Sequence, residues 1–182
     1  MERNLAYVAL FAALIAVLGL IPKITLMSGV PITAQSLGIM LCGTVLGARR
    51  GALAVLLFLG LVALGLPLLA GGRGGIGVFF TPSVGYLIGW PIAAYATGWI
   101  TERFGAGKPL ALTAGIASVI GGIVVLYVPG IIGMAAMLDK TLPQASLLAL
   151  PFIPGDLVKA VLAGLVTAAL ARARPGAVLS RS

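Results

Sequence analysis

An acid and an amine stand three residues apart in an otherwise apolar stretch, residues 152–160, which reads FIPGDLVKA. Residues three apart share one face of a helix, so Asp156 and Lys159 are expected to lie side by side in its first turns. A charge at the centre of a membrane helix costs about 2.5–3.5 kcal/mol, so such a pair is tolerated best where it faces a polar cavity or a ligand. The alternative is a mutually neutralising pair near the membrane surface, with Lys159 extending toward the headgroups.

A glycine-rich segment is the second candidate for binding. Residues 70–77 read AGGRGGIG and place Arg73 among five glycines. Glycine lets the backbone adopt positive φ and approach a ligand closely, and the exposed N–H groups of such a loop can hold an anion or an amide. We therefore predict ligand contacts from Arg73, Gly72, Gly74 and Gly75. The segment does not match a Walker A phosphate loop, and the alternative is a flexible external connector with Arg73 in water.

The three charges of this candidate site sum to +1, because Asp156 offsets one of the two cations. A ligand with a single negative charge would neutralise the site. Gln35 and Thr33, within the segment VPITAQSLG, either line the site or cap the helix that follows them. Tyr86 either stacks on the ligand or lies at the membrane interface, where tyrosine is enriched.

The side chains needed for catalysis are missing. The chain contains no histidine, which excludes Ser–His and Cys–His nucleophilic sites and histidine metal sites. Cys42 is the sole cysteine, so an internal disulfide is excluded and a small buried packing residue is expected. The two aspartates, Asp139 and Asp156, do not form a facing catalytic pair. We predict that the chain is not an enzyme and needs no metal or cofactor.

The composition predicts that helices in a lipid bilayer position these residues. The chain has 182 residues, of which 60% are hydrophobic and 9% charged, whereas a soluble domain has about 25% charged residues. A bilayer admits only helices or closed barrels, and the apolar residues run continuously instead of alternating as in a barrel. Trp90 and Trp99 are assigned to packing or to the interfacial belt. The net charge of +8 is dispersed, which argues against nucleic-acid binding.

The predicted fold class is all-α, a single transmembrane domain of six helices over residues 1–182. A crossing needs about 20 apolar residues, and the expected helices cover residues 4–20, 33–48, 51–66, 82–101, 110–127 and 154–171. Pro129 is expected to kink or end the fifth helix. Residues 131–151 are interrupted by Asp139, Lys140 and Pro143, so we expect a partial or surface-lying segment there.

The basic residues predict the orientation in the membrane, because cytoplasmic loops carry an excess of Lys and Arg. Six crossings place most of the 12 basic residues on one side: Arg3, Arg49, Arg50, Arg103, Lys108, Arg172, Arg174 and Arg181. The other side receives Lys23, Arg73 and Lys140, and Lys159 falls within the last helix. Both termini are therefore expected in the cytoplasm, and the protein is expected in the cell membrane.

The first helix carries small residues at Ala6, Ala9, Ala13 and Ala16. This spacing places them on one stripe, and small stripes allow another helix to approach closely in lipid. The stripe predicts either a docking face for a partner membrane protein or packing within the bundle.

Five segments together resemble the BioY family, the biotin-specific S components of energy-coupling-factor (ECF) transporters. They read VPITAQSL, LGARRGAL, GLPLLAGGRGGIG, PSVGYLIG and FIPGDLVKA, at residues 30–37, 46–53, 65–77, 82–89 and 152–160. The resemblance implies a six-helix bundle with a biotin site near the outer surface, covered by the loop between the third and fourth helices. It also implies two kinds of partner, a membrane coupling protein and a pair of ABC-type ATPases, and it favours Ala9 and Ala13 as docking residues.

The resemblance also implies roles for the charged residues. Asp156 suits the N–H groups of the ureido ring, Lys159 suits the valerate carboxylate, and Tyr86 can contact the bicyclic ring. Some relatives have Asn at the position of Arg73, and some have Arg at the position of Leu87. We infer that Arg73 supplies the cation missing at Leu87, with the division of roles left open among Arg73, Asp156 and Lys159.

Two alternatives remain at the sequence level. The chain could serve a different vitamin, such as thiamine or riboflavin, although the FIPGD and glycine-loop segments argue against this. A membrane enzyme acting on lipid or peptide would need a nucleophile with a base, or two facing carboxylates.

Overall fold

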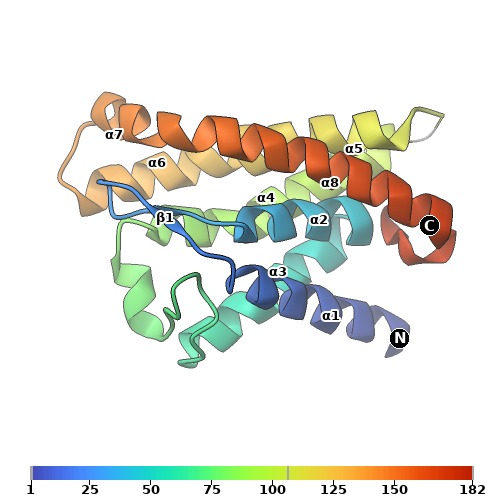
Figure 1. The fold of residues 1–182 in the computed structure, drawn as a ribbon, viewed down its shortest axis with the longest axis horizontal. Coiled ribbons are helices and arrows are strands. Elements are labelled where there is room, and N and C mark those ends of the chain that lie inside the picture. The colour runs from blue at the N-terminus through green and yellow to red at the C-terminus, as the bar shows by residue number, and fades with distance from the viewer. Residues whose placement is uncertain (1, 106, 182) are drawn as a thin grey trace.

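Helices make up most of the structure, a computed structural model that describes residues 2–105 and 107–181. Figure 1 shows them side by side with both chain termini at one end. The α-helices are α1 (Glu2–Leu18), α2 (Gln35–Leu46), α3 (Ala48–Ala63), α4 (Val84–Phe104), α5 (Leu110–Val119), α6 (Leu126–Met137), α7 (Leu142–Ala149) and α8 (Ile153–Ala173). A hairpin of two short antiparallel strands, β1 (Ile24–Thr25) and β2 (Pro31–Ile32), joins α1 to α2. The sequence patterns did not predict this hairpin.

Two pairs of helices are continuous. A π-helical turn, η2 (Ile120–Val125), joins α5 to α6, and a 3₁₀ turn, η3 (Leu150–Phe152), joins α7 to α8. The resulting helices, Leu110–Met137 and Leu142–Ala173, have 28 and 32 residues. Within the described part of the chain, these two are long and apolar enough to cross a membrane, by length and composition. Six helical stretches therefore form among the described residues; the first four lie close to the predicted ranges, and the last two are longer than predicted.

The prediction for residues 131–151 is wrong. Its first part continues α6 through Pro129 to Met137, and its later part begins the last helix as α7. Proline lacks the N–H that would bond to the carbonyl four residues earlier, here that of Val125. The wider π turn ends at Val125, so the ladder is already loosened at that carbonyl and the helix passes the proline.

The chain reverses at Gly47, between α2 and α3. Gly47 has a φ of 85°, a left-handed conformation that favours glycine. On the neighbouring helix, a Cβ at Gly98 would overlap the backbone of Gly47 and Ala48, so this glycine lets α4 pack directly against the turn. The carboxylate of Glu102, also on α4, accepts the N–H of Ala48 at 3.0 Å and so satisfies a free donor at the start of α3.

Three of the four alanines of the α1 stripe face outward, and Ala16 is half-buried against the core. Val8, Phe11 and Ile15 are buried on the inner face of α1, where it packs against α2 and α3. Ala9 and Ala13 are exposed on its other face. Packing within the bundle, one of the two alternatives for this stripe, is therefore wrong for Ala9 and Ala13.

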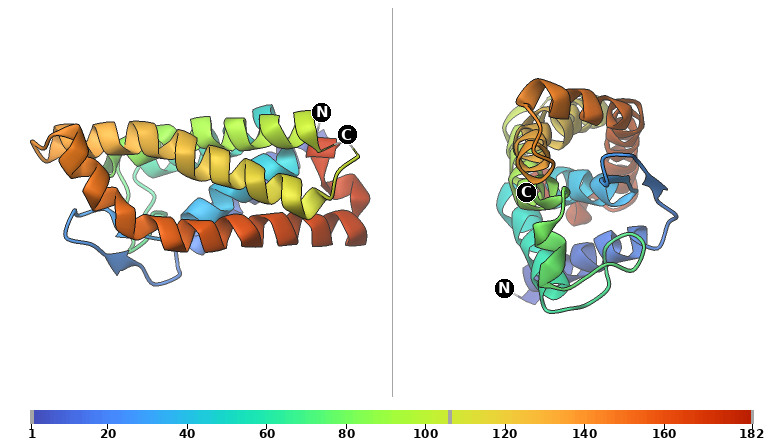
Figure 2. Two further views of the ribbon diagram at one scale, coloured as in Figure 1. Left: turned by 90° about the horizontal axis from the view of Figure 1, so that it is seen from above. Right: turned by 90° about the vertical axis from the view of Figure 1, so that its left-hand side faces the viewer.

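The loops that matter for binding lie at the end of the bundle away from the termini. Figure 2 shows the β1–β2 hairpin projecting beside the loop between α3 and α4. That loop contains the glycine-rich segment and a 3₁₀ turn, η1 (Ile76–Phe80). At the opposite end, α8 is followed by two short 3₁₀ turns, η4 (Pro175–Ala177) and η5 (Leu179–Arg181).

Candidate functional site

A pocket opens between the hairpin, the glycine-rich loop and the ends of α2, α4, α6 and α8. It contains about 550 Å³ of space free of protein atoms, including the part open to the outside. Its walls are formed by Val30, Pro31, Ile32, Thr33, Gln35, Ser36, Leu69, Arg73, Ser83, Tyr86, Leu87, Trp90, Leu126, Phe152, Asp156 and Lys159. The structure therefore brings together six of the nine residues predicted to bind a ligand.

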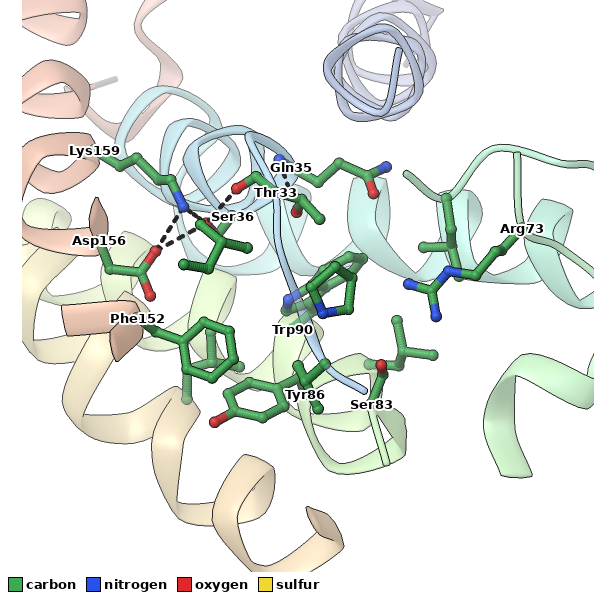
Figure 3. Close-up of a pocket in the computed structure, with 16 residues that line it drawn as sticks. Thr33, Gln35, Ser36, Arg73, Ser83, Tyr86, Trp90, Phe152, Asp156 and Lys159 are labelled. Atoms are coloured by element: carbon green, nitrogen blue, oxygen red, sulfur yellow. Dashed lines mark hydrogen bonds and ion pairs between the residues drawn. The ribbon is translucent and has the colours of Figure 1, made fainter. Parts of the chain in front are cut away.

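Asp156 and Lys159 form an ion pair at one end of the pocket. The Lys159 ammonium lies 2.8 Å from Oδ1 of Asp156, and the two side chains are only 9% and 14% exposed for the acid and the amine. They share a helix face as predicted, in the first two turns of α8. Figure 3 shows both side chains directed toward the pocket, so the alternative in which Lys159 extends toward the headgroups is wrong.

Two residues that sequence reasoning missed complete this polar cluster. The Ser36 hydroxyl donates to Asp156 Oδ1 at 3.2 Å and accepts from the Lys159 ammonium at 2.9 Å. The Tyr127 hydroxyl donates to Asp156 Oδ2 at 2.9 Å. Ser36 directly follows Gln35, so its polarity at the start of an apolar helix was a usable signal. Tyr127 gave no local signal, because its role depends on packing of α6 against the start of α8.

Arg73 lies at the opposite end of the pocket. Figure 3 shows its guanidinium directed into the pocket from the glycine-rich loop, across from the acid and the amine. Its Nε donates to the carbonyl of Ala70 at 3.3 Å, and it forms no ion pair with any carboxylate among the described residues. Arg73 is half-buried, and this burial lowers its pKa below the ordinary value, although an arginine keeps its charge under all usual conditions. Four guanidinium N–H groups therefore remain available for an anion.

Gln35 lines the pocket, but its side-chain amide forms hydrogen bonds with the backbone. Its nitrogen donates to the carbonyls of Ile15 and Leu68 at 3.1 and 3.0 Å, and its oxygen accepts the N–H of Ala70 at 3.0 Å. Gln35 thus fastens the start of the glycine-rich loop to α1 and α2. Thr33 lines the pocket and accepts the N–H of Gln35 at 3.3 Å, but the capping residue of α2 is Ala34.

The predicted glycines shape the loop and do not line the pocket. Gly72 and Gly75 have φ values of 69° and 82°, which side chains with a Cβ rarely adopt. The N–H of Gly75 donates to the carbonyl of Val62 at 2.8 Å, and Leu69 pairs with Arg73 through two backbone hydrogen bonds. At Gly74, a Cβ would overlap the carbonyl of Leu66. This turn holds Arg73 at the edge of the pocket.

Aromatic side chains form the wall between the two charged ends. Tyr86 and Phe152 lie with ring centroids 5.8 Å apart, and the indole of Trp90 lies beside them in Figure 3. A Cβ at Gly130 would lie 2.5 Å from the Tyr86 ring, so this glycine on α6 makes room for the tyrosine. The assignment of Trp90 to packing or to the interface omitted its place in the pocket wall. Trp99, by contrast, is half exposed on α4.

Two buried hydroxyls in the pocket wall have no hydrogen-bond partner within residues 2–105 and 107–181: the Tyr86 hydroxyl and Ser83 Oγ. Buried polar groups are normally satisfied, so these two are available to a ligand. The same described residues contain no group of three His, Cys, Asp or Glu side chains that could hold a metal ion. The pocket is thus suited to a long ligand with a polar head, an apolar middle and an anionic tail.

Comparison with known proteins identifies the family. The model of the BioY family matches residues 2–176 of the chain. The chain belongs to the BioY family. This confirms the resemblance inferred from the five sequence segments.

Individual members of the BioY family match over nearly the whole chain. The biotin transporter BioY of Rhodobacter capsulatus is 53% identical over 100% of both chains. The one from Rhizobium etli is 50% identical over 90% of each. A solved structure described as the S component for biotin from an ECF-type ABC transporter superposes with a TM-score of 0.92 at 32% identity, covering 100% of this chain and 96% of the other. All three descriptions are of transporters, which supports the prediction that the chain is not an enzyme.

Proposed function

We propose that the chain is the biotin-binding S component of an ECF-type uptake transporter in the cell membrane. The observation that carries this proposal is the pocket with a paired acid and amine at one end and, at the other, an arginine that has no ion-pair partner among the described residues. Biotin has a complementary shape: a ureido ring with two N–H donors and one carbonyl, a bicyclic thioether, and a chain ending in a carboxylate. The names of the relatives and of the structural neighbour support the same ligand.

The ureido ring is assigned to the cluster around Asp156. A carboxylate has about four lone-pair sites, and Lys159, Ser36 and Tyr127 occupy three of them. One site on Oδ2 is left to accept a ureido N–H. The Lys159 ammonium donates to two oxygens, so its third N–H can donate to the ureido carbonyl.

The valerate carboxylate is assigned to Arg73, in place of Lys159. The charge of Lys159 is already balanced by Asp156 at 2.8 Å, whereas Arg73 has no acid partner within the described chain. A guanidinium can bind a carboxylate through two parallel hydrogen bonds. The pocket carries a net charge of +1, which the biotin anion neutralises. The thioether ring then packs against Tyr86, Trp90 and Phe152.

The placement in the membrane and the partners follow from the same proposal. We infer six crossings with both termini in the cytoplasm, so that the pocket opens on the outer side. The exposed Ala9 and Ala13 of α1 provide a smooth face for the membrane coupling protein. The family resemblance implies that two ABC-type ATPases supply the energy, and the lack of a Walker A sequence in this chain agrees with that division.

A thermal-shift comparison of vitamins tests the ligand. A ligand that binds the native state raises the melting temperature by mass action. We expect biotin to stabilise the purified protein in detergent, and equal concentrations of thiamine and riboflavin to leave its melting temperature unchanged. Stabilisation by thiamine or riboflavin without any by biotin would overturn the proposal in favour of another vitamin.

A further inference from the structure

A second hollow lies at the other end of the bundle, where Figure 1 places both termini and the junction of α2 and α3. Its walls come from the first turn of α3, the last turns of α4 and the C-terminal turn η5. It contains about 970 Å³ of space free of protein atoms, much of it open to the surroundings. It shares no residue with the proposed biotin pocket.

Two adjacent arginines, Arg49 and Arg50, line this hollow. They lie in the first turn of α3, where the helix dipole is positive and a cation is disfavoured. Within the described residues, neither forms an ion pair. Two guanidinium groups without an ion-pair partner among the described residues can bind an anion, and arginine binds phosphate oxygens through two parallel hydrogen bonds.

One acid faces the same hollow and must be included in the charge. Glu102 lines it, and one of its oxygens accepts the N–H of Ala48 at 3.0 Å. Glu102 forms no ion pair with either arginine in the described structure. The hollow therefore has a formal charge of +1, which matches a ligand with one negative charge.

The remaining walls are aromatic and apolar. Tyr95 and Trp99, four residues apart on α4, are 46% and 50% exposed. Exposed Trp and Tyr are typical of the level of lipid headgroups. Leu46, which is fully buried, lines the same hollow. An inorganic anion would leave these walls without contacts, whereas a lipid offers both a phosphate and apolar surface.

We propose that this hollow binds the headgroup of an anionic phospholipid that carries a single phosphodiester charge, such as phosphatidylglycerol. Arg49 and Arg50 contact the phosphate, and Tyr95 and Trp99 contact the glycerol and the start of the acyl chains. The site is independent of the proposed biotin pocket.

Native mass spectrometry of the purified protein in detergent tests the proposal. Phosphatidylglycerol, phosphatidylcholine and glycerol phosphate are added separately at equal concentration. We expect wild type to retain phosphatidylglycerol in preference to the other two, and the double variant Arg49→Gln/Arg50→Gln to lose at least five-fold of that occupancy. The matched control is Arg172→Gln/Arg174→Gln, which removes two exposed arginines at the same end outside the hollow and is expected to retain the lipid.

Three outcomes would overturn the proposal. Equal loss in both double variants would indicate a general effect of surface charge. Equal retention of phosphatidylcholine or of glycerol phosphate by wild type would remove the lipid specificity. Unchanged lipid retention in Arg49→Gln/Arg50→Gln, together with lost co-purification of the coupling protein, would assign the arginines to an acidic partner surface. Biotin binding, measured in each variant, shows that the fold is intact and keeps this test separate from the biotin proposal.

Discussion

Lys159 meets two oxygens in this structure, Asp156 Oδ1 at 2.8 Å and Ser36 Oγ at 2.9 Å, and this limits what it can offer a ligand. The carboxylate already balances the charge of this ammonium, so the ammonium attracts an anionic group only weakly. It can still donate a hydrogen bond to a neutral group. Arg73, which faces the same pocket without an acid partner among the described residues, then becomes the partner of the ligand's carboxylate.

Replacing Arg73 by Gln tests this division of roles at the residue scale. We expect biotin affinity to fall by about 1.5–3 kcal/mol, the size of a hydrogen bond to a charged group, which is roughly 10- to 150-fold in the dissociation constant. The methyl ester of biotin, which has no carboxylate, should bind wild type and the variant with similar affinity. The measurement is isothermal titration calorimetry in detergent. An equal loss for acid and ester would place the carboxylate elsewhere.

The sequence identified the charged residues of the site and omitted much of their surroundings. Asp156 and Lys159 were found because charges in an apolar run are costly and their spacing shares a helix face. Ser36 and Tyr127 were missed because a hydroxyl in an apolar helix is common, and only the packing of α2 and α6 against α8 reveals their contacts. Gln35 was found, but its three backbone contacts depend on a loop path that no local pattern predicts.

At the scale of elements, the approach of α4 to α6 sets the aromatic wall of the pocket. A Cβ at Gly85 would overlap the carbonyl of Pro129, and one at Gly133 would lie 2.5 Å from the nitrogen of Gly85. Tyr86, the next residue, rests against Gly130. Small residues at this crossing let the two helices touch through their backbones, which fixes the position of Tyr86.

The substitution Gly85→Ala is therefore expected to be costly. The new methyl group would overlap backbone atoms, which cannot rotate away as a side chain can. We therefore expect the free energy of unfolding to fall by about 1–3 kcal/mol, which is typical of overpacking. We also expect weaker biotin binding. Gly115→Ala is the matched control, because its nearest neighbour, the carbonyl of Ala160, would lie 3.7 Å from the new methyl. The control should melt at the wild-type temperature or slightly above it, since alanine favours helix. Thermal melts in detergent compare the two variants, and similar melting temperatures would contradict this account.

The helices themselves followed largely from sequence, with one error that has a physical cause. Apolar runs and their breaks located the first four helices within about three residues at each end, whereas the fifth ends at Met137 instead of residue 127 and the sixth begins at Leu142 instead of residue 154. Of the two outcomes predicted for Pro129, a kink or an end of the helix, an end is wrong. The structure continues through it because the π turn Ile120–Val125 precedes it. A π turn has no sequence signature of its own, so the continuation to Met137 could not have been predicted.

At the scale of the whole molecule, the distribution of basic residues predicts sidedness. Both termini lie at one end of the bundle (Figure 1), as an even number of crossings requires. Lys140, between α6 and α7, and Arg174, directly after α8, are exposed, and Cys42 is buried. Figure 1 shows the α6–α7 connection and the end of α8 at opposite ends of the bundle. A cysteine introduced at position 140 or 174 can therefore show by chemical labelling which side of the membrane it faces, because the buried Cys42 should react little.

We expect a membrane-impermeant maleimide to label Lys140→Cys in intact cells, and Arg174→Cys only after the cells are permeabilised. The wild-type protein, with Cys42 alone, is the control and should remain unlabelled in intact cells. Labelling of both introduced cysteines from outside would contradict six crossings. Labelling of Arg174→Cys alone would reverse the proposed orientation.

The central claim is that the acid and amine at the start of α8 recognise biotin, and calorimetry of a charge-neutral double variant tests it most directly. Asp156→Asn/Lys159→Met removes both charges, which avoids the about 3–5 kcal/mol cost of leaving one buried charge unpaired. The matched control is Asp139→Asn/Lys140→Met, an exposed acid and amine outside the pocket. At Asp139, where φ is 49°, asparagine is well tolerated.

We predict that the pocket variant melts close to wild type but binds biotin at least about 10-fold more weakly, a loss of 1.5 kcal/mol or more, while the control binds as wild type does. A folded Asp156→Asn/Lys159→Met protein with unchanged biotin affinity would contradict the account.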